Sequence, residues 1–426
     1  MDTEIIMKKK QRDFGLIFKS HPENCVEQMK THHVILLDDS ERGWKNANGE
    51  PRSHIMIEGE NYQALKILEY THEGKIDMIY ADPPYNTGNK DFVYNDAFVD
   101  DEDTYRHSKW LSFMKNRLMI ARKLLSERGV IFISIDDHEM AHLKLLCDQV
   151  FGENNFVGNF IWETKRGAKG VPPRNLLVFN HEYILCYAKD KLNGGFKFRG
   201  ADRSDEGFAN PDNDPRGVWR GESITATGKQ NNYFDIVNPE NGNKHHGNWA
   251  FSSATIDKMI TEGKIIWPKK PTGKPIQKKF KNTYTNQTKS ISTVLGWHHT
   301  ATATKELMEL FDGRKIFDHV KPLPLMKYLI QQATQSDSIV LDFFAGSGTT
   351  GQAVAEMNKE DGGNRQFIII TNNDISESLP LGIANEATYP RLEKTIKAFT
   401  NLRYLKVELK KKQKKLKSQQ GDSLTI

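Results

Sequence analysis

Short apolar runs alternate with amphipathic segments along most of the chain. The runs at residues 76–81, 130–135 and 365–371 have the length and composition of buried strands. Segments 62–70 and 110–126 instead place apolar residues three and four positions apart, which is typical of a helix with one buried face. Strands that alternate with helices in this way predict an α/β fold with a doubly wound sheet.

The same pattern extends along the chain on both sides of one interruption. Strand-like runs occupy 159–169 and 175–189, and helical patterns return at 306–311 and 325–334. Between these pairs, glycine, asparagine, proline and lysine become frequent and the hydrophobic periodicity fades. The sequence therefore predicts a loop-rich segment inserted into the α/β pattern.

Both ends of the chain lack this regularity. Residues 1–50 are polar with little periodicity, and they predict an extension that lies on the main domain. At the other end, a helical pattern at 389–398 leads into 406–417, which is mostly lysine with few leucines. This predicts a solvated basic helix or tail at 401–426, with phosphate contact as the weaker alternative.

Composition limits the class of protein further. A chain of 426 residues can bury one large core or two domains. No run is long and apolar enough to span a bilayer, and the charged amino terminus has no signal-peptide apolar region. The cysteines Cys25, Cys147 and Cys186 are scattered without metal-type spacing. We therefore expect a cytoplasmic protein without structural zinc or disulfides. The formal net charge of +5 does not by itself indicate a polyanionic partner.

The first stretch that suggests chemistry follows the apolar run Ile76–Ala81. Asp82, Pro83, Pro84 and Tyr85 place a carboxylate and an aromatic ring at the carboxyl end of this predicted strand. The prolines fix φ and lack an amide proton, so the chain must leave the sheet as a stiff, open turn. Ligands of open α/β sheets bind at this end of the strands. A proline-terminated strand whose tyrosine packs on the next helix would have the same residues, so the tetrapeptide alone is only suggestive.

A second polar group follows the predicted strand 130–135. Asp136, Asp137, His138 and Glu139 are residue types that bind metals. Consecutive residues at a strand end point in different directions, however, so a helix N-terminus capped by Asp is the favoured interpretation. We therefore predict no metal site.

A glycine turn follows a further apolar strand. Residues 338–350 read Ser-Ile-Val-Leu-Asp-Phe-Phe-Ala-Gly-Ser-Gly-Thr-Thr, and a helix is expected over 349–358. The run from Gly346 to Gly351 matches the dinucleotide fingerprint Gly-x-Gly-x-x-Gly, which by itself would indicate an NAD-dependent oxidoreductase. That fingerprint normally lies in the first βαβ unit of its domain, whereas several strands precede it here. An oxidoreductase also gives no reason for Asp82 and its neighbours.

The two stretches together resemble the amino-methylating DNA methyltransferases, which pair Asp-Pro-Pro-Tyr with Phe-x-Gly-x-Gly. Because Asp82 precedes Phe344, the order of the motifs is that of the β class. The resemblance extends over most of the chain and is closest to the modification subunits of type III restriction systems. It implies a Rossmann-like sheet that binds S-adenosylmethionine. Because both motifs are intact, a non-catalytic DNA-binding subunit descended from such an enzyme is disfavoured.

The resemblance also implies how the target base is held. Asp82 and the carbonyl of Pro83 would accept N–H bonds from the exocyclic amine of adenine, and the two prolines would hold them rigidly. Tyr85 would stack on a base that has been rotated out of the duplex. Methyl transfer from the sulfonium of the donor is a direct displacement that depends on positioning, so no metal is required.

The donor would lie against the glycine turn and the strand ends beside it. In the resembled family the turn at 58–61 usually reads Gly-Asp-Asn, and here Glu60 stands where Asp is commoner. A side chain at 372–374 is expected to meet a ribose hydroxyl, and Lys321 would pair with the carboxylate of the donor. The expected donor contacts are Lys321, Asp342, Phe344, Ala345, Gly346, Ser347, Gly348, Thr349, Asn373 and Asp374.

The inserted segment at 189–286 combines aromatic residues with many lysines and arginines. A small β domain that contacts nucleic acid has this composition, and so does an ordinary insertion with solvated lysines. Its place between the two motifs is where the resembled class carries its target-recognition domain, which favours the first interpretation. The expected DNA contacts are Lys165, Arg166, Lys269, Lys270, Lys278 and Lys279.

The sequence thus predicts a site-specific methyltransferase that acts on the N6 amine of adenine in double-stranded DNA. Cytosine-N4 is the alternative target, and Asp82 in place of Ser favours adenine, as the resemblance implies. The expected protein partners are a second copy of the chain and a restriction subunit, although a stand-alone enzyme stays open because the chain is short for a type III modification subunit. The predicted parts are an extension (1–50), a catalytic half (51–188), a target-recognition domain (189–286), a cofactor-binding half (287–400) and a basic tail (401–426).

Overall fold

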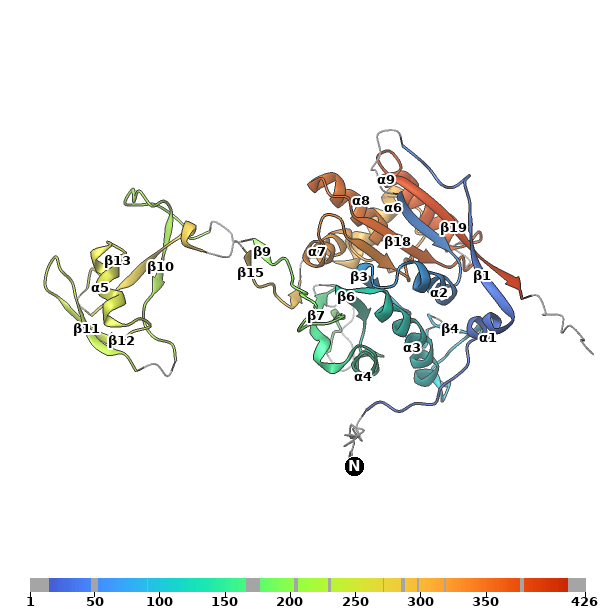
Figure 1. Cartoon of the computed structure of the whole chain (residues 1–426), viewed down its shortest axis with the longest axis horizontal. Coiled ribbons are helices and arrows are strands. Elements are labelled where there is room, and N and C mark those ends of the chain that lie inside the picture. The colour runs from blue at the N-terminus through green and yellow to red at the C-terminus, as the bar shows by residue number, and fades with distance from the viewer. Residues whose placement is uncertain are drawn as a thin grey trace, which may run out of the picture. The chain divides into compact units, whose positions relative to one another are not determined.

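The structure is a computed structural model. It describes residues 15–46, 53–89, 91–165, 177–202, 206–228, 231–270, 272–284, 288–296, 299–317, 319–375 and 379–412. The chain divides into two compact units, one formed by Met1–Arg199 with Ser292–Ile426 and the other by Gly200–Ile291 (Figure 1). No helix among the described residues is long and apolar enough to cross a membrane.

The larger unit is built on a ten-stranded sheet. In spatial order its strands are β1 (His32–Asp38), β19 (Asn401–Lys411), β2 (Ser53–Glu58), β18 (Gln366–Thr371), β17 (Ile339–Asp342), β3 (Ile76–Ala81), β6 (Leu125–Ile135), β8 (His181–Ala188), β7 (Phe156–Glu163) and β16 (Val294–Leu295). The six neighbours from β19 to β6 run parallel, and β1 and β8 pair antiparallel on either side of them. The predicted α/β sheet is confirmed.

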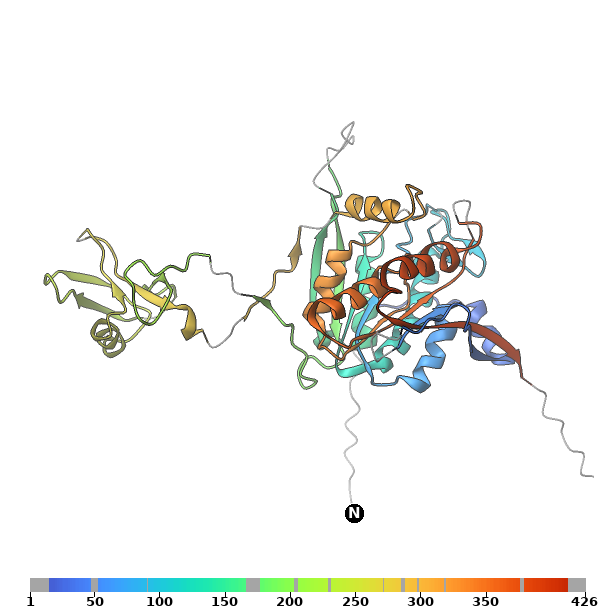
Figure 2. The ribbon, with the colours of Figure 1, turned by 90° about the horizontal axis from the view of Figure 1, so that it is seen from above.

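Helices cover both faces of this sheet (Figure 1, Figure 2). Ile368 of β18 belongs to the main core cluster on one face, whereas Phe367 and Ile369 lie against Gly351 on the other. This alternation explains why the parallel strands read as continuous apolar runs. The helices of the larger unit are α1 (Asn24–Thr31), α2 (Asn61–Thr71), α3 (Arg106–Leu124), α4 (Met140–Phe151), α6 (Thr300–Leu310), α7 (Leu323–Ala333), α8 (Thr349–Asp361) and α9 (Tyr389–Ile396).

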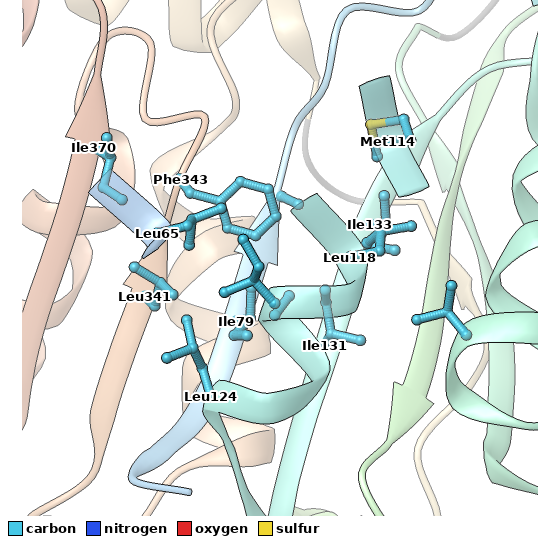
Figure 3. Packing of buried hydrophobic residues seen from close by; sticks show 14 of the residues in the cluster. Leu65, Ile79, Met114, Leu118, Leu124, Ile131, Ile133, Leu341, Phe343 and Ile370 are labelled. Atoms are coloured by element: carbon cyan, nitrogen blue, oxygen red, sulfur yellow. The ribbon is translucent and has the colours of Figure 1, made fainter. Parts of the chain in front are cut away.

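The main core joins helices α2 and α3 to the central strands. Leu65 of α2 and Leu118 of α3 pack with Ile79, Ile131 and Leu341, which lie on three neighbouring strands (Figure 3). All five side chains are fully buried. The core therefore fixes the positions of β3 and β17, the two strands that carry the predicted motifs.

The predicted basic helix at the carboxyl end is wrong. After α9 the chain forms the long strand β19, which pairs parallel with β2 and antiparallel with β1. Leu402 and Tyr404 are buried while Arg403 between them is exposed, which is the alternation of a strand. The lysines of 406–417 obscured this alternation, and the partner strands lie far away in the sequence. The rest of the tail, 413–426, lies outside the described residues.

The amino-terminal segment is more than the predicted extension. Residues 24–38 form α1 and β1, and β1 is the edge strand beside β19. All residues of β1 are half-buried or exposed. An edge strand of this kind has no strong hydrophobic pattern, which is why the periodicity did not reveal it.

The smaller unit is a loop-rich β structure with its own small core. That core consists of Ile224, Ile236, Trp249, Ile256 and Ile265. Its described elements are β9 (Ala201–Asp202), β10 (Trp219–Ser223), β11 (Tyr233–Val237), β12 (Lys244–Asn248), α5 (Ser253–Thr261), β13 (Ile265–Ile266), β14 (Ile276–Phe280) and β15 (Thr288–Lys289). They form sheets in the orders β10-β14-β13, β11-β12 and β15-β9. The unit begins and ends within about ten residues of the predicted insertion 189–286.

Candidate active site

The two predicted motifs leave the sheet side by side. Strands β3 and β17 are parallel neighbours, and Asp342 at the end of β17 is in register with Tyr80 of β3. The chain continues from β3 into Asp82 and from β17 into the glycine turn. A cavity of 560 Å³ is lined by Asp82, Tyr85 and Gly346 among others. This is the ligand position that an open α/β sheet provides.

The turn after β3 is held from the helix beside it. The indole Nε1 of Trp110, a fully buried residue of α3, donates to the carbonyl of Pro84 at 2.7 Å. This bond holds the turn that carries the carboxylate of Asp82 and the carbonyl of Pro83, although the two prolines have no amide protons to stabilise it. Because Trp110 lies in an ordinary amphipathic helix, nothing in the sequence pattern marked it as a support of the site.

Lys321 and Glu182 join Asp82 and Tyr85 in one polar cluster. The ammonium Nζ of Lys321 lies 2.9 Å from Asp82 Oδ1 and 3.7 Å from Glu182 Oε2. It also donates to the hydroxyl of Tyr85 at 3.0 Å. Lys321 was predicted as a partner of the donor carboxylate, whereas in this structure it contacts the residues predicted to hold the target amine.

The hydroxyl of Tyr85 has one proton and two carboxylates within reach. Its oxygen lies 2.9 Å from Glu182 Oε2 and 3.3 Å from Asp82 Oδ1, so donation to Glu182 has the better geometry. Among the described residues, bonds to Asp82 end on Oδ1, which leaves Oδ2 available to an incoming amine. The cluster therefore fixes the ring of Tyr85 and keeps one acceptor for a ligand.

Burial and charge act in opposite directions on this cluster. Burial raises the pKa of Asp82, and the nearby ammonium of Lys321 opposes that rise. Burial by itself would lower the pKa of Lys321, but the charges of Asp82 and Glu182 outweigh it, so the pKa lies above its usual value. Lys321 is only 8% exposed and stays cationic at neutral pH.

The second motif forms a tight turn stabilised by Asp342. Its carboxylate accepts the backbone N–H of Phe344 at 3.0 Å and the hydroxyl of Thr350 at 2.5 Å. Burial raises the pKa of Asp342 to about 7, against the effect of these two bonds. Asp342 therefore holds the turn together through bonds on both of its oxygens, in addition to lining the cavity.

Two glycines give this turn its shape. Gly346 and Gly348 have φ angles of 48° and 82°, in the left-handed region that favours glycine. A Cβ added at Gly346 would lie 3.1 Å from Cζ of Phe317, so the space there is also limited. Gly348 immediately precedes α8, whose amino-terminal turn faces this end of the sheet.

A buried arginine that the sequence analysis missed supports the start of α8. Arg391 of α9 donates to the hydroxyls of Ser347 and Thr349 at 3.0 and 2.7 Å, and to Gln352 at 2.7 Å. Burial lowers the pKa of its guanidinium to about 10, which still leaves it charged at neutral pH. The hydroxyls of Ser347 and Thr349, two residues predicted to contact the methyl donor, are therefore also bonded to the protein itself.

A second cavity of 520 Å³ adjoins the first, and the residues that line both are Asp82, Pro84, Asp91, Phe317, Phe344, Ala345 and Gly346. It extends toward the carboxyl ends of β2 and β18, where Glu60 and Asp374 line it. The two cavities meet at the glycine turn, so a ligand with two arms could occupy both. Phe344 lines each of them.

Arg117 of α3 organises the wall of this second cavity. It is 1% exposed and donates to Glu23, Glu60 and Asn61 at 2.8, 2.7 and 2.6 Å. Asn61 in turn donates to the carbonyl of Phe343 at 2.9 Å. Glu60 stands where the resembled family usually has Asp. The buried guanidinium of Arg117 holds its side chain at the cavity wall. Neither Glu23 nor Arg117 was singled out in the sequence.

Of the residues expected at a ribose, Asp374 lines the second cavity and Asn373 does not. The amide of Asn373 donates to the carbonyl of Leu381 at 3.1 Å, and its Oδ1 accepts the backbone N–H of Asn385 at 3.3 Å. Asn373 therefore connects its strand end to the segment before α9. Asn372, which was considered with it, lines the cavity.

The polar group before α4 forms a hydrogen-bonded anchor. Asp136 accepts the backbone N–H of His138 at 2.9 Å in the turn before α4. A helix does start here, but its N-cap is Glu139, without a side-chain capping bond, so the predicted cap by Asp is wrong. Glu139, fully buried, accepts from His107 and His142 at 2.7 and 2.8 Å, and their ligand-type atoms lie within 4.8 Å of one another.

Glu139 also accepts the amide of Asn86 at 2.5 Å. Asn86 directly follows Tyr85, is fully buried and has a φ of 59°. Because three donors already satisfy the carboxylate of Glu139, its role is to hold this left-handed residue beside the site.

The expected DNA contacts differ in their surroundings. Lys165, Lys269 and Lys270 are exposed. Lys279 is half-buried, with its ammonium 5.4 Å from the centre of the Tyr284 ring. Lys278, 13% exposed, forms ion pairs with Asp212 and Asp214 of its own unit. Its charge is thus already neutralised. Arg166 lies outside the described residues.

Fold and site together define an α/β protein whose ligand cavity lies at the carboxyl ends of parallel strands, between a rigid carboxylate turn and a glycine turn. The DNA methylase family matches residues 76–418, and the chain belongs to this family. The predicted resemblance is confirmed.

Relatives of the chain include subunits of restriction–modification systems. The type III restriction-modification enzyme StyLTI Mod subunit of Salmonella typhimurium is 34% identical, over 81% of this chain and 57% of that protein. The EcoPI Mod subunit of Escherichia phage P1 is 32% identical, over 93% and 70%. The type II methyltransferase M.KpnI of Klebsiella pneumoniae is 33% identical, over 82% and 89%. The chain thus spans little more than half the length of the first of these relatives.

Proposed function

We propose that this chain is a site-specific DNA methyltransferase that transfers the methyl group of S-adenosylmethionine to the N6 amine of a flipped adenine in double-stranded DNA. The observation that carries the proposal is the shared cavity of 560 Å³, which Asp82 and Tyr85 line from one motif and Phe344 and Gly346 from the other. Membership of the DNA methylase family and the likeness to type III Mod subunits support it.

The two joined cavities suit the two reactants. We assign the adenosine part of the donor to the cavity lined by Glu60 and Asp374, and its methionine part to the glycine turn. The target base would enter the other cavity beside Tyr85. Phe344 lines both cavities and would lie next to the point where donor and target meet. Transfer then depends mainly on holding the two reactants in line.

The chemistry requires little beyond this positioning. The lone pair of the adenine amine attacks the methyl carbon, and the carbon–sulfur bond breaks with its electron pair moving to sulfur. The sulfonium becomes a neutral thioether, and the amine, briefly cationic, loses one proton. The free Oδ2 of Asp82 is the acceptor for that proton, and the carbonyl of Pro83 accepts the second N–H. The base must leave the duplex first, because its amine is otherwise paired.

The test of the proposed function uses purified protein, tritium-labelled S-adenosylmethionine and unmodified genomic DNA. We expect label to enter double-stranded DNA and to be recovered as N6-methyladenine after digestion. Recovery as N4-methylcytosine would instead establish the alternative target. If no label is transferred although the donor binds, a non-catalytic DNA-binding role becomes the better explanation.

Tyr85 provides a finer test of base stacking. Tyr85→Ala should lower kcat by about 10²-fold or more, because the flipped base loses its stacking face, worth about 1 to 3 kcal/mol, and its orientation. Tyr85→Phe keeps the ring but loses the bonds to Glu182 and Lys321, so we expect about a tenfold loss. Single-turnover methylation rates measure both. Equal losses in the two variants would contradict a stacking role.

We further propose that the smaller unit, close to the predicted segment 189–286, reads the DNA sequence. Its exposed lysines and its place between the two motifs support this assignment. A restriction subunit is proposed as a partner, from the likeness to Mod subunits. A second copy of the chain remains a proposed partner on the strength of the sequence resemblance alone.

Two exposed lysines test phosphate contact. Replacing Lys269 and Lys270 with Ala should weaken binding to all DNA sequences and reduce the log–log salt slope by about two units, one per phosphate contact. Fluorescence anisotropy between low and physiological salt measures this slope, and donor affinity should not change. Lys278→Ala is the contrasting variant: its two ion pairs predict mainly a loss of stability of the smaller unit. An unchanged slope in the double variant would assign both lysines to solvent.

A further inference from the structure

Three charged side chains meet in the cavity, and their charges do not cancel. Asp82 and Glu182 both lie within ion-pair distance of Lys321, at 2.9 and 3.7 Å. One ammonium therefore serves two carboxylates. When both carboxylates are ionised, the cluster has one surplus negative charge, and that surplus exists only because Glu182 is present.

The side chain of Glu182 faces the cavity and contacts Tyr85. It lies on β8 in register with the buried Trp162 of β7, and its side chain lines the cavity together with Asp82 and Gly346. Its Oε2 accepts the hydroxyl of Tyr85 at 2.9 Å. A surplus charge in a poorly hydrated site is unfavourable until a cation joins it. The cluster therefore favours a ligand with a positive charge.

Other acidic groups at this cavity are less suited to supply that charge. Asp342 lines it, but its two oxygens are already engaged by Phe344 and Thr350, and its pKa of about 7 leaves it only partly ionised at neutral pH. Asp136 accepts the N–H and contacts the ring of His138 at 2.9 Å, and Asp91, which lines both cavities, accepts the N–H and the hydroxyl of Thr87 at 3.0 Å. Without Glu182, Asp82 and Lys321 would form a neutral pair.

We infer that Glu182, from the cavity assigned to the target base, makes the adjoining donor site select a cationic methyl donor over the neutral product of transfer. This inference rests on the proposed function. Transfer removes the positive charge from sulfur, so the group that favours S-adenosylmethionine gives S-adenosylhomocysteine no comparable advantage. Glu182 thereby limits product inhibition, in addition to positioning the hydroxyl of Tyr85.

The test compares the two ligands in one variant by calorimetry on the full chain. Glu182→Gln keeps the shape of the side chain and removes its charge. We expect its affinity for S-adenosylmethionine to fall about tenfold, or 1.4 kcal/mol, with S-adenosylhomocysteine within about twofold. Equal weakening of both ligands, or no change in either, would overturn the inference.

The control Glu408→Gln makes the same change of charge on β19, six strand positions from β8, at an exposed residue. It should alter neither affinity. Glu182→Asp keeps the charge and should retain the preference for the cationic donor, even if Glu182→Gln fails to fold. Loss of the preference in Glu182→Asp would contradict a role for charge.

The inference and the proposed function fail in different ways. If the wild-type protein methylates DNA but Glu182→Gln weakens both ligands alike, only the inference is overturned. If the wild-type protein binds neither ligand, both are overturned.

Discussion

Asp82→Ala is expected to abolish methyl transfer while donor affinity stays within about tenfold, or 1.4 kcal/mol. The variant removes the acceptor for the target amine, so we expect kcat to fall by about 10³-fold or more, within the range for a positioned proton acceptor. In the proposed arrangement the donor binds mainly at the glycine turn, which Asp342 rather than Asp82 holds together. Single-turnover methylation measures the first effect and calorimetry with S-adenosylmethionine the second.

Asp82→Asn is the matched control, because it preserves the shape of the side chain. Its neutral amide retains one acceptor oxygen but cannot take up a proton, so we expect a loss between those of the wild type and Asp82→Ala. Both variants leave Lys321 paired with Glu182, which limits structural damage. Full methylation by Asp82→Ala would disprove the assignment of this turn as the site of transfer.

Gly346→Val is expected to eliminate measurable donor binding. The φ of 48° is poorly accessible to a branched residue, and its Cβ would lie 3.1 Å from the ring of Phe317, at a position that lines both cavities. The side chain would thus occupy space assigned to the donor and also distort the turn. We expect a loss of at least about 10²-fold, or roughly 3 kcal/mol, in affinity by calorimetry.

Gly362→Val separates backbone strain from the donor site. Gly362 follows α8, has a φ of 70°, and a Cβ there meets no atom within 4 Å. The backbone strain is comparable, yet donor affinity should stay near that of the wild type. Calorimetry of the wild type with NAD completes the experiment, because tight binding of NAD and none of the methyl donor would favour the oxidoreductase interpretation of the glycine turn.

The parts of the site that are contiguous in sequence could be predicted from sequence. Asp82 to Tyr85 and Phe344 to Gly348 each consist of a strand end followed by a turn, and proline and glycine restrict such turns locally. The strands themselves were visible because parallel strands buried on both faces are apolar throughout. That the two motifs meet was decided by the structure, because the sequence does not specify that β3 and β17 are neighbours in the sheet.

The supporting residues could not be found in this way. Glu182, Arg117 and Arg391 lie in a strand or helix whose local pattern is ordinary, and each matters through contacts with residues distant in the chain. Lys321 stood out, but its neighbours Asp82 and Glu182 did not follow from its position. A charged residue in such a segment is normally solvated, so only burial reveals that it is part of a network.

The sequence by itself determined the α/β class, the central strands and the two motifs, because these depend on local periodicity and on the backbone limits of proline and glycine. Only the tertiary structure decided that the basic segment after α9 forms β19, because the partners β1 and β2 that make it a strand come from the other end of the chain. Only the tertiary structure also placed two carboxylates around Lys321 and paired Lys278 within its own unit. Whether a charge is neutralised depends on neighbours in space, and the order of residues does not specify them.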